Sequence, residues 1–207
     1  MRIISGAYKG RLIQALPTNA TRPTTDRVRE AWASTTENLL TSGFDGCVVL
    51  DAFAGSGALG IEALSRGAAR VVFCEKSAAA FSVLRENTAA LGLSDSLCVK
   101  LVHADTLKLN TLSSLSHFGP FDLLVLDPPY SLSTIAVARV LSALSSGGAL
   151  SAGCIISYEQ ARPNRLDETS LISWLQRIPC PPHTSFILEA RKTYGTVALD
   201  YLRFDAG

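Results

Sequence analysis

The sequence predicts an α/β protein built on a mostly parallel sheet of seven strands, one of them antiparallel, with helices on both faces. Two observations predict this fold. From residue 47 onward, short apolar runs alternate with helix-like segments, and the chain closes with two β-rich runs around a turn. A length of 207 residues, 47% of them hydrophobic, suits one core. We therefore expect a single domain, with residues 1–45 as an N-terminal appendage and residues 46–207 as the main core.

Strands are predicted where β-branched and other apolar residues cluster between turn residues. These runs are residues 47–52, 70–75, 98–103, 121–127, 153–158, 184–189 and 196–204, with a hairpin turn at residues 192–195. Helices are predicted between them, at residues 58–66, 78–91, 106–115, 134–144 and 171–176. Gly67 and Gly92 follow two of these helices, where glycine is the usual C-terminal cap.

The N-terminal appendage is predicted to hold two short strands, residues 2–5 and 11–16, and a helix over residues 25–40 with Asp26 in its first turn. Residues 1–30 contain six basic and two acidic side chains, a net charge of +4, and the other 177 residues carry −3. The appendage is therefore a basic segment attached to a nearly neutral core, and a basic segment of this kind suits a nucleic-acid partner.

Several classes of protein are disfavoured by composition. No apolar run approaches the roughly 20 residues that cross a bilayer, and the first residues lack the apolar stretch of a secretory signal. The five cysteines are scattered and mostly embedded in apolar runs, where a thiol behaves as a small hydrophobe. We expect a cytoplasmic protein with no membrane span, no metal site and a monomeric state.

A glycine-rich turn follows the first core strand. Gly55-Ser56-Gly57-Ala58-Leu59-Gly60 satisfies the pattern G-x-G-x-x-G, and Glu75 ends the next strand, near the spacing at which a dinucleotide enzyme places its ribose-binding acid. A nicotinamide dehydrogenase is therefore one reading of this segment.

Asp51 favours a different ligand. It stands directly before the turn, where a carboxylate would repel the pyrophosphate of a dinucleotide. S-adenosylmethionine has no phosphate and carries two cationic groups, an ammonium and a sulfonium, which a carboxylate attracts. Glu75 would then accept both ribose hydroxyls, and Asp105, after the third strand, would bind the adenine amino group. The pocket is completed by Ala52, Phe53, Gly55, Gly57 and Lys76.

Each of these residues also has a purely structural reading. Gly55 and Gly57 could form a packing turn, Asp105 could cap a helix that starts at Thr106, and Glu75 could be a solvated strand end. Their order and spacing favour the joint interpretation, because three acids end three successive strands at the sheet edge where open α/β sheets bind ligands.

The fourth strand stops at Asp127-Pro128-Pro129-Tyr130. Proline fixes its own φ and restricts the residue before it, so Asp127 and the Pro128 carbonyl are held rigidly. Two fixed acceptors suit the two hydrogens of an exocyclic amino group, whose nitrogen would then face the methyl donor. Tyr130 can stack on the base. The structural alternative is that the prolines merely end a strand. The motif predicts a nucleobase amino-methyltransferase that needs no metal and acts on a single-stranded or flipped-out base.

The sequence resembles the RsmD family of bacterial 16S ribosomal RNA guanine-N2 methyltransferases over essentially the whole chain. The resemblance rests on residues 2–6 and 9–11, on Thr21-Arg22-Pro23-Thr24-Thr25-Asp26-Arg27-Val28-Arg29-Glu30-Ala31, on residues 53–68, on Asp127-Pro128-Pro129-Tyr130 and on Lys192-Thr193-Tyr194-Gly195. The chain differs from the family pattern at Ala52, where leucine is usual, and over residues 32–37.

The resemblance implies a Rossmann-like class I methyltransferase fold, S-adenosylmethionine as cofactor, and 16S rRNA or an assembling small ribosomal subunit as partner. It implies that Asp127, Pro128, Pro129 and Tyr130 are the catalytic residues, with Asp127 also next to the cofactor. It further implies that the basic N-terminal segment grips RNA. The residues assigned to RNA are Arg2, Lys9, Arg11, Arg22 and Arg27.

Three alternatives stay open at this point. DNA adenine-N6 methyltransferases share the glycine and proline motifs, although they usually have Asn in place of Asp127. The second alternative is the nicotinamide dehydrogenase, and the third is a non-catalytic RNA-binding assembly factor. For Arg22, Thr24 and Arg27, an N-capped helix with solvated arginines is an equal structural reading.

Overall fold

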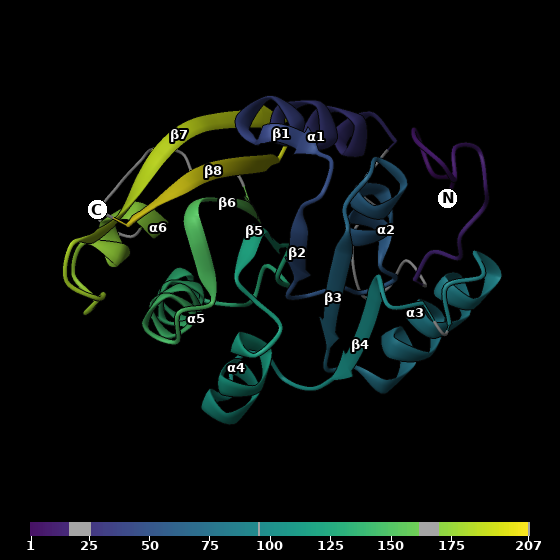
Figure 1. Ribbon diagram of the computed structural model, residues 1–207. Helices are drawn as coiled ribbons and strands as arrows, with labels where there is room; N and C mark the ends of the chain where they lie inside the picture. Colours follow the sequence, from purple (N-terminus) through teal and green to yellow (C-terminus); the bar gives the residue numbers. More distant parts are fainter. Residues whose placement is uncertain (17–25, 95, 162–169, 207) are drawn as a thin grey trace. The chain divides into compact units, whose positions relative to one another are not determined.

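The computed structural model describes residues 1–16, 26–94, 96–161 and 170–206, which divide into two compact units, residues 1–105 and 106–207. Within these described segments, seven strands form a sheet in the order β4-β3-β2-β5-β6-β8-β7. Strands β4, β3 and β2 belong to the first unit and the other four to the second (Figure 1). The predicted α/β class and the predicted seven-stranded sheet are confirmed.

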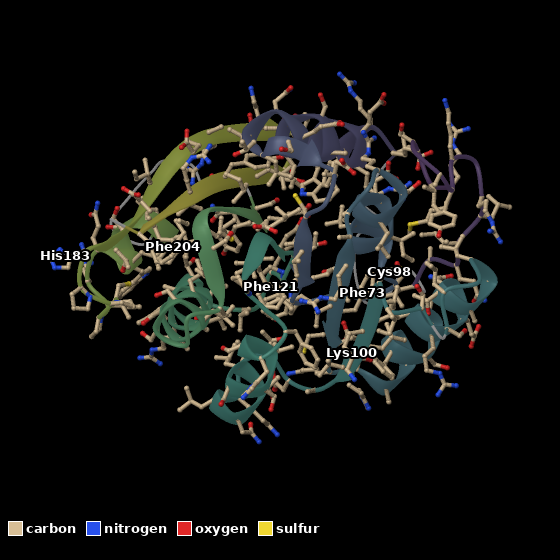
Figure 2. The ribbon with its side chains drawn as sticks, viewed as in Figure 1. Phe73, Cys98, Lys100, Phe121, His183 and Phe204 are labelled. Atoms are coloured by element: carbon tan, nitrogen blue, oxygen red, sulfur yellow. The ribbon has the colours of Figure 1, made fainter. Side chains whose placement is uncertain are left out.

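The first unit is a parallel sheet covered by helices. Strand β3 pairs in parallel with β2 and with β4, and α2 and α3 pack against these strands (Figure 1). Residues 71–74 of β3, including Phe73 (Figure 2), are fully buried, as expected for a parallel strand covered on both faces. The elements are α1 (Asp26–Leu39), β1 (Thr41–Phe44), β2 (Val48–Asp51), α2 (Ala58–Ser65), β3 (Arg70–Glu75), α3 (Ala78–Ala90) and β4 (Val99–His103).

The second unit contains the antiparallel strand. Strands β5 and β6 pair in parallel, and β8 runs antiparallel to both β6 and β7. The predicted single antiparallel strand is therefore confirmed and is β8. The elements are α4 (Leu109–Ser116), β5 (Phe121–Leu126), α5 (Thr134–Ser146), β6 (Leu150–Ala161), α6 (Leu171–Leu175), β7 (Thr184–Tyr194) and β8 (Val197–Ala206).

The predicted position of the C-terminal hairpin turn needs correction, and one short strand was not predicted. The hairpin turn lies at residues 195–196, with Gly195 at φ +58°, and Lys192 to Tyr194 continue β7. The sequence placed the turn too early because β-propensity falls at Arg191 and Lys192, although both still pair with β8. In addition, the chain forms the short strand β1 after α1, which no alternation of apolar residues predicts.

The two strands predicted in the N-terminal arm, which we define as residues 1–16, do not form. Its two halves are joined by one isolated bridge, Arg2 to Leu12, and by a few backbone bonds, such as that from the Ile3 amide to the Arg11 carbonyl at 3.0 Å. Other backbone donors of the arm bond to α2 instead. The amides of Ile4 and Ser5 donate to the Glu62 carboxylate at 2.9 and 3.1 Å, and the Ala7 amide donates to the Ser65 carbonyl at 2.7 Å. The arm is fastened to α2 instead of forming a sheet.

Helix α1 runs from Asp26 to Leu39 against the predicted range 25–40, with Asp26 in its first turn as expected, and residue 25 lies outside the described segments. Gly67 and Gly92 follow α2 and α3 with positive φ, which confirms their capping positions. None of the helices in the described segments is long and apolar enough to span a bilayer.

Candidate functional site

The segment that leads from β2 into α2 requires glycine at two positions, one in the turn and one in the first turn of the helix. Gly57 has φ +82°, and a Cβ at this residue would lie 2.5 Å from Cδ1 of Leu84. A Cβ at Gly60 would overlap the Phe73 ring (Figure 2). The lack of a side chain at these glycines therefore lets α2 and α3 pack closely against the loop and β3.

Asp51 ends β2 and is only 2% exposed. Its Oδ2 accepts a hydrogen bond from the Gly60 amide at 3.1 Å, and the Phe53 amide also donates to this carboxylate. Burial, reinforced by the charge of Glu75, raises its pKa to about 7, while the two amide bonds oppose the shift. Asp51 thus fixes the start of α2 against the strand end, and it holds a negative charge that is only partly developed near neutral pH.

Glu75 ends β3 and closes the glycine loop. Its Oε2 accepts the Gly55 amide at 2.8 Å and its Oε1 accepts the Ser77 amide at 2.7 Å. Each carboxylate oxygen has more than one acceptor position, so the half-buried group can still accept two hydroxyls from a ligand. The predicted position of Glu75 beside the glycine loop agrees with this geometry.

The other residues predicted for this pocket lie around the same strand ends. Lys76 and Asp105 form an ion pair at 3.5 Å, with the Asp105 side chain 25% exposed. Helix α4 begins at Leu109 with Lys108 as its N-cap, so Asp105 does not cap a helix starting at Thr106. Ala52 is buried and Phe53 is half-buried. Asp51, Glu75 and their glycine loop are thus brought together, and the side chains of Lys76 and Asp105 meet each other.

Asn87 on α3 is a further residue of this site that the sequence reasoning missed. It is 1% exposed, and its Nδ2 donates to the carbonyls of Ser56 and Gln14 at 2.8 and 3.0 Å. Its Oδ1 accepts the Gln14 amide at 2.7 Å. Asn87 therefore ties the glycine loop to the N-terminal arm. No local pattern marks it, because its partners are 31 and 73 residues away in the chain.

The basic N-terminal residues fall into two groups. Arg29 is completely buried and bonds to Asp26 at 2.6 Å and to the Arg2 carbonyl at 2.8 Å, so its charge serves the fold. This guanidinium is also the main cause of the lowered pKa of Asp26. Arg2 pairs with Asp26 at 3.1 Å, and Arg11 bonds to the Ala90 carbonyl. The exposed basic residues include Lys9 and Arg27, and Arg22 and Thr24 lie outside the described residues.

The proline corner lies in the second unit, directly after β5. Pro128 is buried, Asp127 is half-buried, and Pro129 is exposed. Tyr130 is 51% exposed, and its hydroxyl donates to Oε1 of Glu159 at 3.1 Å. The corner therefore presents an aromatic ring at the surface. Glu159, near the end of β6, was also missed by sequence reasoning, because it is one acid among many until the fold places it beside Tyr130.

The described residues hold no cluster of three or more histidine, cysteine, aspartate or glutamate side chains that would suit a metal ion. The chemistry that these two sets of residues support is therefore that of carboxylate and carbonyl acceptors on rigid strand ends. The first set, on the first unit, suits a cationic ligand with a diol. The second set, on the second unit, suits a planar group that donates hydrogens.

Comparisons with known proteins give the context of these features. The family model described as Conserved hypothetical protein 95 (Cons_hypoth95) matches residues 1–177. The chain is 32% identical to the Ribosomal RNA small subunit methyltransferase D of Escherichia coli (strain K12) over 196 residues, 94% of this chain and 92% of that protein. It is 36% identical to the protein of the same name from Haemophilus influenzae over 130 residues, 63% of this chain and 64% of that one.

Solved structures agree with these sequence matches. The Escherichia coli structure named "Putative methyltransferase yhhF" aligns with a TM-score of 0.73 and 30% identity, covering 100% of this chain and 99% of that one. The structure of the Thermus hypothetical protein TTHA0928 aligns with a TM-score of 0.69 and 26% identity, covering 97% and 98%. Fold and site together define a class I methyltransferase. This chain belongs to the Cons_hypoth95 family, which is matched over most of its length and includes the RsmD-type ribosomal RNA methyltransferases.

Proposed function

We propose that this protein transfers the methyl group of S-adenosylmethionine to the N2 amino group of a guanine in 16S ribosomal RNA, as an RsmD-type enzyme. The observation that carries the proposal is the proline corner, because a rigid Asp127-Pro128 acceptor pair followed by an exposed Tyr130 ring suits an aromatic amine and little else. The names of the relatives support the reaction and the RNA substrate.

The residues of the first unit fit the proposed donor. Glu75 retains acceptor capacity for the ribose hydroxyls, and Asp105 offers a partly exposed carboxylate to the adenine amino group. When bound, S-adenosylmethionine supplies an electrophilic methyl group on a sulfonium. The contribution of Asp51 is electrostatic, because a nearby cation favours its ionised form and the ionised form in turn favours the cation.

Asp127 and the Pro128 carbonyl would accept the two amino hydrogens of the base. Accepting both hydrogens draws the nitrogen away from conjugation with the ring and directs its lone pair outward, which is the arrangement needed for in-line attack on the methyl group. Tyr130 would stack on the base and hold it outside the RNA helix. The N–C bond would form as the C–S bond breaks and S-adenosylhomocysteine leaves, and the extra proton of the methylated amine would pass to the Asp127 carboxylate. The proposed partner is thus 16S rRNA, in naked form or in an assembling subunit.

The decisive experiment replaces Asp127. We expect Asp127→Ala to lower turnover on small-subunit RNA by about 100- to 1000-fold, because one of two preorganised acceptors is lost. The affinity for S-adenosylhomocysteine should stay within about threefold, because Asp127 acts chiefly on the base. Asp122→Asn on the same strand is the matched control, since Asp122 bonds to Ser151 at 2.9 Å at the opposite end of β5, and it should leave turnover unchanged.

Nucleoside mass spectrometry identifies the modified atom. Small-subunit RNA from cells without the protein should lack one N2-methylguanosine, and the purified protein should restore it. Restoration of N6-methyladenosine instead would overturn the guanine assignment. Full activity of the Asp127→Ala variant would remove the proline corner from the mechanism.

A further inference from the structure

A buried carboxylate, Glu159, lies beside the proline corner in the second unit. Only 8% of the residue is exposed to solvent. This burial raises the pKa of its carboxyl group. One oxygen, Oε1, accepts the Tyr130 hydroxyl at 3.1 Å, a bond that acts against the pKa shift. A carboxylate is rarely buried without a matching set of donors.

The neighbouring buried acid shows what a complete set of partners looks like. Asp200, on β8, is 2% exposed and is held by a two-pronged ion pair with Arg191 and by Nε2 of Gln160 at 2.7 Å. Among the residues that the structure describes, Glu159 forms no ion pair, and the donor to its carboxylate is the Tyr130 hydroxyl. A carboxylate can accept several hydrogen bonds, so this group has acceptor capacity beyond the Tyr130 bond.

Strand register places Glu159 next to the proline corner. The last paired residues of β5 and β6 are Leu126 and Tyr158. Because the two strands are parallel, the next residue of each chain is Asp127 on one side and Glu159 on the other. Paired positions of neighbouring strands project to the same face of a sheet. The second unit therefore carries two carboxylates, Asp127 and Glu159, at adjacent strand ends. The Tyr130 hydroxyl donates a hydrogen bond to Glu159.

Two adjacent carboxylates match the hydrogen-bond pattern of one base. The Watson–Crick edge of guanine presents the N1–H and the N2 amino group side by side, so both positions donate. Adenine presents an amino group beside an unprotonated N1, which is an acceptor and would face a carboxylate unfavourably. We propose that Glu159 accepts the N1–H of the target guanine while Asp127 and the Pro128 carbonyl accept its two N2 amino hydrogens. This inference rests on the proposed function and adds the residue that selects the base.

Glu159 has a simpler possible role, which is only to orient Tyr130 through the hydroxyl bond. The two roles predict different results. An orienting residue would affect every base equally, and Tyr130→Phe, which keeps the ring and removes the bond, would reproduce its loss. A base-selecting residue changes the ratio of activities on two bases that differ at N1. A site built to bond a substrate hydrogen rejects the analogue that lacks it.

The test uses 2-aminopurine, which keeps the amino group at C2 but has an unprotonated N1. Small-subunit RNA would be assembled by splint ligation with either guanine or 2-aminopurine at the nucleotide that the wild-type protein modifies. We expect the wild-type protein to prefer guanine by about 10- to 100-fold in kcat/KM. Glu159→Gln, whose amide can donate to N1, should lose activity on guanine and gain on 2-aminopurine, so that the ratio narrows by about tenfold or inverts.

Control variants isolate the effect. Glu189→Gln on β7, an exposed carboxylate paired with Arg203, should keep the wild-type ratio. Tyr130→Phe should lower both activities and also keep the ratio. An unchanged ratio in Glu159→Gln would overturn the proposal, and so would a wild-type protein that uses both bases equally, a measurement that does not depend on how the variant folds. Failure of the wild-type protein to methylate guanine RNA at all would instead remove the proposed function.

Discussion

At the scale of single residues, the sequence predicted where the acids at the strand ends lie. It did not predict their burial or their hydrogen bonds. Asp51 and Glu75 were expected beside the glycine loop, and both are there. What the sequence could not supply is that each carboxylate already accepts backbone amides from its own loop. Burial and hydrogen bonding depend on how the chain closes, and they decide that Asp51 is an interior acid with a pKa raised to about 7.

The raised pKa of Asp51 makes stability depend on pH. The folded state keeps this proton up to about pH 7, whereas the unfolded chain releases it near 3.8, so rising pH destabilises the fold within that window. We expect Asp51→Asn, which keeps an acceptor for Gly60, to become more stable relative to the wild type by about 2 kcal/mol between pH 5 and pH 7. Urea unfolding at pH 5, 6, 7 and 8 measures this difference, which should level off above pH 7. Parallel stability profiles for the two proteins would contradict the assignment.

At the scale of elements, the core strands and helices were predicted within a few residues, because apolar alternation and glycine caps are local signals. The N-terminal arm was predicted wrongly for the opposite reason. Its partners, Glu62, Ser65 and Asn87, lie far along the chain, and a run of residues that looks like a strand cannot show that a helix will take its hydrogen bonds. The same distance in sequence concealed Asn87 and Glu159 as parts of the site.

Because Asn87 links the glycine loop to the N-terminal arm, we expect its replacement to lower both stability and ligand affinity. Asn87→Ala leaves the buried Ser56 carbonyl, and the carbonyl and amide of Gln14, without this partner. We expect the free energy of unfolding to fall by about 2–4 kcal/mol and the affinity for S-adenosylhomocysteine to fall about tenfold, because the glycine loop loses its support. Chemical denaturation and calorimetric titration measure the two effects.

The matched control for this variant is Asn38→Ala, which removes an exposed asparagine from α1. It should change stability by less than about 0.5 kcal/mol and leave ligand affinity unchanged. If Asn87→Ala lost stability but bound S-adenosylhomocysteine normally, Asn87 would be a structural residue with no role in the donor site.

At the scale of the whole molecule, the net charge of +4 over residues 1–30 overstates the basic surface. Arg29 is buried, and Arg2, although exposed, is paired with Asp26, so part of that charge is buried or neutralised. The sequence shows that basic residues are concentrated near the N-terminus. It could not tell which arginines reach solvent, because that depends on the packing of the arm against α1 and α2. The proposal that this segment grips RNA therefore rests on the exposed members, which include Lys9 and Arg27.

These two residues give a test of RNA binding. We expect the double variant Lys9→Ala, Arg27→Ala to bind small-subunit RNA more weakly and to lower the slope of log affinity against log salt by about 1.4, the value for two lost contacts to single-stranded phosphates. Fluorescence binding measurements between about 50 and 200 mM salt give this slope. Arg139→Ala, which removes an exposed arginine from α5, should keep the wild-type slope. An unchanged slope in the double variant would show that RNA is held elsewhere.

The hydrogen bonds of the arm to Glu62 and Asn87 also have a consequence for the order in which the chain acquires its shape during synthesis. The acceptors and donors that fix residues 4, 5 and 14 are encoded 57 to 73 positions later. The arm therefore cannot form these bonds until α2 and α3 have been synthesised. A nascent chain stalled before residue 62 should leave the arm open to protease, and one extended well beyond residue 87 should protect it.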